Sequence, residues 1–134
     1  MEDDMIGFVL VSHSRKLAEG ARELGLMMAP DVPVEAAGGM ADGGTGTDYG
    51  RILEAVEKVA PKAADGILVI VDMGSACMTT EMVLEDRGDI LPRAVMVDCP
   101  FAEGTVAGMV SASMGLGISE VIRAAAEACS VGKF

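Results

Sequence analysis

The 134-residue sequence has no tryptophan, one tyrosine, three phenylalanines and a single histidine. Positive charge is also scarce, because 10 Lys and Arg against 21 Asp and Glu give a formal net charge of −11. With few basic residues and few rings for base stacking, we expect no nucleic-acid binding. The apolar runs at 6–11 and 66–71 are much shorter than the roughly 20 residues of a membrane-spanning helix. We therefore expect no membrane insertion.

Cysteine is sparse as well, and Cys77, Cys99 and Cys129 are odd in number and far apart. This pattern is not typical of a disulfide framework or of a zinc site, so we expect buried thiols, no metal and a reducing compartment. The sequence does not open with a basic segment and a long apolar one, as a secretory signal would. These features predict a cytoplasmic protein.

Aliphatic side chains and methionine are abundant: apolar residues make up 51% of the sequence, and 11 residues are methionines. The length fits one domain, which we assign to residues 1–134. Because methionine adapts to irregular packing, we expect most of these side chains in the core and some at a subunit interface.

Strands are predicted at 6–11, 32–36, 66–72 and 94–99, and three of these segments are continuously apolar, as parallel strands covered on both faces are. Apolar residues at helical spacing predict helices between them. The predicted helices are one with Leu17, Ala21, Leu24 and Met28, one with Ile52, Val56, Val59 and Ala60, and three at about 76–86, 103–114 and 118–129. This alternation predicts a doubly wound α/β domain.

Glycine, serine and threonine concentrate in the segments after the predicted strands, at 12–15, 37–48, 73–81 and 100–105. In a parallel sheet these segments meet at one edge. His13 would project there, beside the amino end of a helix whose free amides and dipole suit a phosphoryl group.

An imidazole that attacks phosphorus needs one unprotonated nitrogen and an acceptor that holds the proton on the other. We expect Asp72, at a solvent-facing strand end, to be that acceptor, so the predicted catalytic pair is His13 and Asp72. Hydrogen-bond donors to the phosphoryl oxygens are expected around them. The candidate phosphoryl-binding residues are Ser12, Ser14, Gly38, Gly39, Thr47, Gly74, Ser75 and Thr105.

These residues also have plainer explanations. A lone histidine at a strand end is more often a surface or core residue than a nucleophile. Glycine-rich loops can be simple turns, and Asp72 could cap the helix that begins near Ser75.

Five segments together resemble a known family: "VSHS" (11–14), "AAGG" (36–39), "GTGTD" (44–48), "VDMGSA" (71–76) and "EGTVAG" (103–108). They are similar to the phosphotransfer subunit of the phosphoenolpyruvate-dependent dihydroxyacetone kinase, in its domain related to the mannose-family enzyme IIA. The resemblance covers nearly the whole chain, and "MGSA" favours the dihydroxyacetone branch over the sugar-transporter branch.

The resemblance implies that His13 takes a phosphoryl group from a histidine phosphocarrier protein and passes it to ADP on the nucleotide subunit of dihydroxyacetone kinase. It also implies a homodimer, a four-stranded parallel sheet of order 2-1-3-4, and no cofactor beyond the covalent phosphohistidine. Some family members continue into fused phosphocarrier and enzyme I-like domains, so we expect a separate donor protein here. The identity of that donor and of the final substrate stays open.

Two alternatives also stay open: a mannose-type enzyme IIA of a sugar transporter, and a non-catalytic regulatory domain in which His13 is inert. A tetrapyrrole metal chelatase, suggested by "SHSR", is disfavoured because a second metal-binding histidine is absent.

Overall fold

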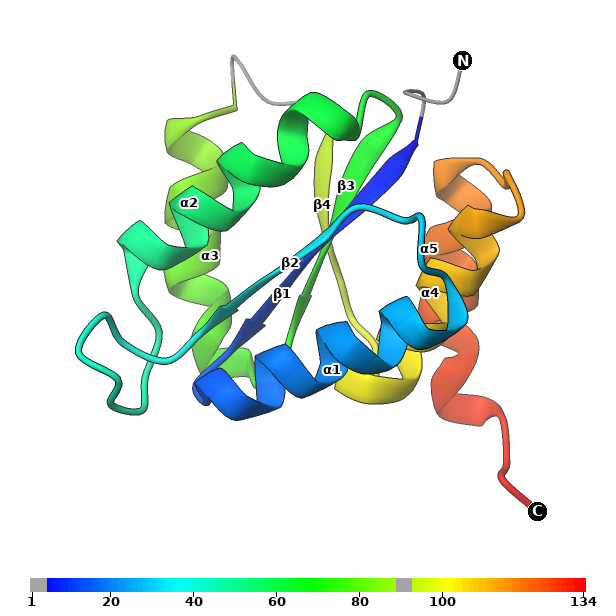
Figure 1. The fold of residues 1–134 in the computed structure, drawn as a ribbon, viewed down its shortest axis with the longest axis horizontal. Coiled ribbons are helices and arrows are strands. Elements are labelled where there is room, and N and C mark those ends of the chain that lie inside the picture. Colours follow the sequence, from blue (N-terminus) through cyan, green and yellow to red (C-terminus); the bar gives the residue numbers. More distant parts are fainter. Residues whose placement is uncertain (1–4, 89–92) are drawn as a thin grey trace.

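A four-stranded parallel sheet with helices on both faces forms the molecule in the computed structural model, which describes residues 5–88 and 93–134 (Figure 1). The elements are β1 Ile6–Ser12, α1 Arg15–Met28, β2 Val34–Gly38, α2 Tyr49–Val59, β3 Gly66–Val71, α3 Cys77–Asp86, β4 Ala94–Val97, α4 Phe101–Ser113 and α5 Ile118–Glu127. The strand order β2-β1-β3-β4 confirms the predicted fold class and topology.

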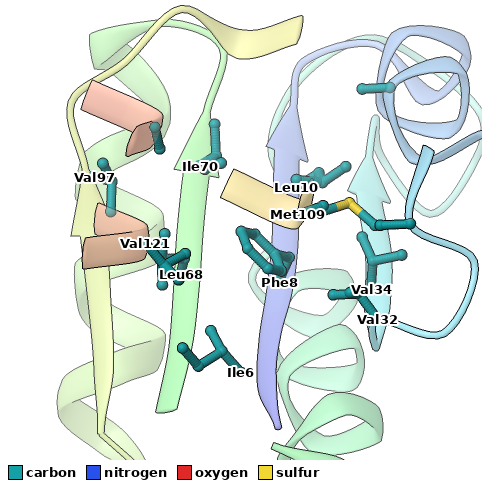
Figure 2. Close-up of a cluster of buried hydrophobic side chains, with 13 residues drawn as sticks. Ile6, Phe8, Leu10, Val32, Val34, Leu68, Ile70, Val97, Met109 and Val121 are labelled. Atoms are coloured by element: carbon teal, nitrogen blue, oxygen red, sulfur yellow. The ribbon is translucent and has the colours of Figure 1, made fainter. Parts of the chain in front are cut away.

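Strand β1 lies at the centre of the sheet and is buried along its whole length. Phe8 and Leu10 belong to the cluster that packs beneath α1, α4 and α5 (Figure 2). Val9 and Val11, which alternate with them, belong to the cluster beneath α2 and α3. Because side chains alternate across a strand, a continuously apolar segment supplies both cores. Figure 1 shows the two helical layers on opposite sides of the sheet.

Helix α4 approaches the sheet closely at Gly108. A Cβ atom at this glycine would lie 2.9 Å from the ring of Phe8, which is closer than side-chain carbons pack. The glycine therefore makes room for the phenylalanine ring at the centre of this core.

Of the apolar stripe predicted for α1, only Ala21 lies on the core face. The buried residues of α1 are Ala18, Ala21 and Gly25, whereas Leu17 is 46% exposed and Leu24 is 40% exposed. Small residues occupy the inner face because α1 packs closely against the end of β2 and against α4. In α2, the predicted residues Ile52, Val56 and Val59 are buried as expected.

Most methionines are not in the core, contrary to the expectation. Among the described residues, only Met109 is a fully buried methionine. The methionines exposed by more than half are Met27, Met28, Met73, Met78, Met82 and Met114. These six flexible side chains therefore lie on the molecular surface rather than in the interior.

The cysteines are free, but only two of them are partly covered. Cys77 and Cys99 are partly buried and Cys129 is exposed, so the expectation of buried thiols was wrong for Cys129. Burial, with smaller contributions from Asp98 and Cys129, raises the pKa of the Cys99 thiol to about 11. Cys99 is therefore protonated at neutral pH.

No helix in the described part of the chain combines the length and the apolar character of a membrane span. The assignment of residues 1–134 to one domain stays a prediction.

The packing of the core predicts how two substitutions change the free energy of unfolding. Phe8 is fully buried, so Phe8→Ala should lower the free energy of unfolding by about 3–5 kcal/mol, through lost burial and a cavity. The matched control is Phe134→Ala, because Phe134 is fully exposed and its loss should cost less than about 0.5 kcal/mol. Urea unfolding measures the free energy of unfolding of both variants. Equal effects of the two variants would contradict the packing described here.

Candidate functional site

The central pair of strands brings the two predicted catalytic residues together. Strands β1 and β3 are parallel neighbours, with Val11 opposite Val71 at their carboxyl ends. The backbone amide of Asp72 donates to the carbonyl of Val11 over 3.0 Å. His13 and Asp72 therefore leave adjacent strands at the same edge of the sheet.

Three hydrogen bonds hold the Asp72 carboxylate. Its Oδ1 lies 3.1 Å from His13 Nδ1, and its Oδ2 accepts from the His13 backbone amide and from the Ser12 hydroxyl, each over 3.0 Å. The Asp72 side chain is 8% exposed, against 26% for His13. The expectation of a solvent-facing carboxylate was therefore wrong, because these donors surround it.

The charge of Asp72 fixes the tautomer of the histidine ring. Burial alone would raise the pKa of Asp72, but the hydrogen bonds from the His13 amide, the His13 ring and Ser12 outweigh it, and the pKa lies below its ordinary value. An ionised carboxylate only accepts hydrogen bonds, so the neutral ring must carry its proton on Nδ1. Its Nε2 then has a free lone pair.

Ser75 meets the other side of the ring. Its Oγ lies 2.9 Å from His13 Nε2, so its hydroxyl donates to the unprotonated nitrogen. Ser75 and Gly74 belong to a short 3₁₀ helix, Gly74–Ala76, that leads into α3. Both residues are exposed, and a Cβ atom on Gly74 would meet nothing within 4 Å. Of the predicted phosphoryl-binding residues, Ser75 therefore contacts Nε2, and Gly74 precedes it at an open position.

Ser12 and Ser14 form hydrogen bonds next to the His13–Asp72 pair. Ser12 is fully buried, and its hydroxyl donates to Asp72 while its oxygen accepts from the Ser14 amide over 3.0 Å. Ser14 is the N-cap of α1, and its hydroxyl oxygen accepts from the Leu17 amide over 3.2 Å. Since its hydroxyl proton is committed to Asp72, Ser12 is a positioning residue rather than a donor to a phosphoryl oxygen.

Gly38 and Gly39 shape the backbone at the carboxyl end of β2. A Cβ atom on Gly38 would lie 2.7 Å from the Cα of Arg15, so this glycine allows α1 to rest on the end of β2. Gly39 has a φ of +71°, and its amide donates to the Ser12 carbonyl over 3.0 Å. The prediction that the Gly39 amide binds a phosphoryl oxygen was therefore wrong, and Gly38 is buried.

The two predicted threonines have different places. Thr47 Oγ1 lies 3.4 Å from Thr79 Oγ1, so Thr47 contacts α3 near the site. Thr105 is fully buried in α4 and donates to the Phe101 carbonyl over 2.7 Å. The prediction for Thr105 was wrong, because a residue one turn into α4 points into the core.

Sequence reasoning missed the residues that secure the glycine-rich loop. The Gly46 amide donates to the His13 carbonyl over 2.9 Å, which returns this loop to the site. Arg51 Nε donates to the Gly38 carbonyl over 3.1 Å. Asp48 caps α2 through a 2.8 Å bond from the Gly50 amide. Only the cap had a readable signal, an aspartate placed directly before a helix.

Comparisons with known proteins match most of the chain. The family model described as "PTS system fructose IIA component" matches residues 7–122. The chain is 39% identical over 123 residues to the "PEP-dependent dihydroxyacetone kinase, phosphoryl donor subunit DhaM" of Escherichia coli (strain K12), covering 88% of this chain and 26% of that protein. The chain thus spans about a quarter of the length of that relative.

A relative of similar length and two solved structures also match. The chain is 35% identical over 101 residues to "PEP-dependent dihydroxyacetone kinase 1, phosphoryl donor subunit DhaM" of Listeria innocua, covering 75% of this chain and 77% of that one. The unknown function protein EF1359 shares the fold, with a TM-score of 0.76 and 24% identity over 91% of this chain and 93% of that one. A sigma-54 interaction domain protein from Enterococcus faecalis also shares it, with a TM-score of 0.66 and 16% identity over 92% and 89% of the two chains.

The lowered pKa of Asp72 predicts how its replacement depends on pH. The ionised carboxylate stabilises the fold above its unfolded-state pKa, about 3.9, and this contribution is lost as pH falls through the lower folded-state pKa. Asp72→Asn should therefore be less stable than the wild type at neutral pH, with a gap that narrows below about pH 4. Urea unfolding at several pH values measures the difference in unfolding free energy between the wild type and Asp72→Asn. A gap that is the same in acid as at neutral pH would contradict the assignment.

Proposed function

The chain belongs to the family described as the PTS system fructose IIA component, among relatives that are phosphoryl donor subunits of dihydroxyacetone kinase, and from this premise we propose that it carries a phosphoryl group on His13 Nε2. The observation that carries the proposal is the ring itself, held by Asp72 at Nδ1 and met by Ser75 at Nε2. The proposed donor is a histidine phosphocarrier protein. The proposed acceptor is ADP on the nucleotide subunit of dihydroxyacetone kinase.

In the first step, the lone pair of His13 Nε2 attacks the phosphorus of the donor's phosphohistidine. A new N–P bond forms as the donor's N–P bond breaks, and that electron pair returns to the donor ring. Positive charge grows on the His13 ring and is stabilised by the Asp72 carboxylate 3.1 Å from Nδ1. The Ser75 hydroxyl, released from Nε2, can turn to a phosphoryl oxygen, where charge is spread in the transition state.

In the second step, an oxygen of the acceptor's terminal phosphate attacks the same phosphorus. The bond to Nε2 breaks and its electron pair returns to the His13 ring, which restores the lone pair. For ADP the product is ATP, which would then phosphorylate dihydroxyacetone. The chemistry at His13 would be the same for a mannose-type enzyme IIA, so the identity of the acceptor protein separates the two functions.

The proposed homodimer has a suitable surface away from this chemistry. An apolar groove between α1, α4 and α5 is lined by residues that include Leu24, Met28 and Val106. Leu24 lies ten residues after Ser14, the cap of α1, which corresponds to about 15 Å along the helix. A second copy bound there would leave His13 accessible. The dimer stays a prediction.

The histidine is the first test of the carrier function. His13 is the only histidine, so His13→Gln should abolish phosphorylation by phosphoenolpyruvate and the general phosphotransferase proteins. In the wild type the label should be labile in acid and stable in base, as phosphoramidates are. Radiolabel incorporation with acid and base treatment measures this. Acid-labile label in the variant would contradict the assignment, and an unlabelled wild type would favour the regulatory domain.

The two neighbours of the ring should both contribute to the rate. Asp72→Asn should slow phosphorylation roughly a hundredfold or more, by loss of the charge that orients and stabilises the ring. Ser75→Ala should slow it by about tenfold to a thousandfold, as expected for a donor to a transition-state oxygen. The matched control is Ser113→Ala, since the Ser113 hydroxyl donates to the Val110 carbonyl within α4. The phosphorylation rates of the three variants are measured in single-turnover experiments. Wild-type rates in folded Asp72→Asn would reduce Asp72 to a structural role.

A further inference from the structure

Arg15 is the basic residue nearest to His13 in the sequence, and one of its nitrogens has no partner. It is the first residue of α1, directly after the cap Ser14, and it is partly buried. Its Nε is buried and makes no hydrogen bond to the residues that the structure describes. A buried donor without an acceptor costs free energy. An acceptor that arrives at this nitrogen would therefore remove an existing penalty.

A second arginine of the chain provides a contrast. The Nε of Arg87 is also buried without a hydrogen bond, but its Nη2 lies 2.9 Å from Glu57 Oε2, so its charge has a partner. None of the ion pairs found within residues 5–88 and 93–134 involves Arg15. In this part of the chain, no carboxylate oxygen thus lies within 4 Å of the Arg15 guanidinium.

The direction of α1 favours an Arg15 side chain that extends toward His13. In an α-helix every Cα–Cβ bond tilts toward the amino end, and long side chains extend the same way. A side chain in the first turn of α1 therefore leans past the start of the helix, and His13 lies there, two residues before Arg15. Figure 1 shows the start of α1 at the same end of the sheet as the start of α3, which follows Ser75.

The glycine-rich loop after β2 contacts both Arg15 and His13. A Cβ atom on Gly39 would lie 3.6 Å from the Arg15 Cβ and 2.9 Å from the Gly44 carbonyl oxygen, so the loop packs against the base of the arginine side chain. The same loop returns to His13, whose carbonyl accepts from the Gly46 amide over 2.9 Å. One loop therefore holds the two residues beside each other.

A phosphoryl group on His13 would place two negative groups around one ring. The group itself carries about −1.5 to −2 charges at pH 7, and the ring already lies 3.1 Å from the Asp72 carboxylate. The Ser75 hydroxyl that meets Nε2 is neutral. A guanidinium keeps its charge at neutral pH and presents paired donors that match phosphoryl oxygens. It is therefore the side chain best suited to offset this charge.

We propose that the Arg15 guanidinium binds the phosphoryl group on His13 Nε2 and offsets its charge in the transition state and in the phosphorylated protein. The unpaired Nε gains its acceptor when the phosphoryl group arrives. Arg15 forms hydrogen bonds only, so the N–P bonds form and break as described above. Because it touches the transferred group, Arg15 is a catalytic residue in this scheme. This inference rests on the carrier function proposed above.

Lys16 provides a matched control. It is adjacent to Arg15 and carries the same charge, but its side chain is exposed, and successive residues of a helix do not share a face. Replacement of either residue by glutamine changes the net charge by the same amount. A difference between the two variants therefore reports the position of the guanidinium and not the overall charge of the protein.

The first test measures how fast phosphoramidate, a small phosphoryl donor, labels His13. Arg15→Gln should slow labelling about tenfold to a thousandfold, the range for loss of a donor to a transition-state oxygen, whereas Lys16→Gln should match the wild type. Arg15→Lys should fall between them, because lysine keeps the charge but not the planar pair of donors. Equal rates for Arg15→Gln and Lys16→Gln would overturn the proposal.

The phosphorylated histidine phosphocarrier protein is the second donor in this test. Slowing of Arg15→Gln with this protein but not with phosphoramidate would make Arg15 a docking residue and overturn the proposal. A wild type that neither donor labels would refute the carrier function itself. A labelled wild type with equal rates for the two glutamine variants would refute only the role of Arg15.

Phosphorus NMR of the labelled proteins tests the contact directly. A positive charge close to an acid favours its ionised form. The second ionisation of the phosphoryl group should therefore move to higher pH in Arg15→Gln, by about 0.5–1 pH unit relative to Lys16→Gln. Asp72 is present in both variants, so its effect cancels. The same titration midpoint in both would overturn the proposal.

Urea unfolding of the unphosphorylated proteins separates binding from a structural role. The Arg15 Nε has no partner to lose in the described structure, so Arg15→Gln should unfold at the same urea concentration as Lys16→Gln. Arg15→Lys keeps the charge and most of the aliphatic stem. Unfolding at a lower urea concentration in both Arg15 variants would assign the residue a structural role and overturn the proposal.

Discussion

The contact between the Asp72 carboxylate and His13 Nδ1 is the interaction on which the site depends. A free imidazole exchanges its proton between both nitrogens and rotates, so its lone pair points in no fixed direction. Here Oδ2 of the same carboxylate accepts from the His13 backbone amide as well, which ties the ring and its own backbone to one group. Ser12 then holds the carboxylate from the buried side. One charge therefore sets position, orientation and tautomer together.

The sheet supplies the rigidity that this contact requires. His13 follows the central strand, which is buried on both faces, and Asp72 follows its neighbour β3. The register places Val11 opposite Val71, so that Asp72 directly follows one of the paired valines and His13 lies two residues after the other. Movement of Asp72 relative to His13 would require slippage of paired strands, which would expose core side chains to water. Strand pairing thus protects the geometry of His13 and Asp72, the proposed catalytic pair.

The sequence predicted strands and strand-end residues, because these depend on the pattern of neighbouring residues. It did not predict burial that depends on contacts between elements far apart in the sequence. The apolar strands and the positions of His13, Asp72 and Ser75 at their ends could be read directly. The inner face of α1 could not, because it depends on how close α4 and β2 approach, and small residues there carry little hydrophobic signal. Thr105 was predicted where the loop segment 100–105 overlaps the helix 103–114, and the start of α4 at Phe101 places it one turn inside the helix.

Exposed methionines lie on the segment that places Ser75 next to the His13 ring. The His13 side chain is 26% exposed and the Asp72 side chain is 8% exposed, and the proposed carrier function would require this difference, because a lone pair that reaches phosphorus on another protein cannot be enclosed. Specific recognition then has to come from the surrounding surface rather than from a closed pocket. Met73 and Met78 are flexible apolar side chains on the same short segment as Ser75, which meets Nε2. The arrangement therefore combines a fixed orientation of the His13 ring with adaptable apolar side chains beside it, and the carrier function proposed above would use both, since a carrier exchanges one partner for another.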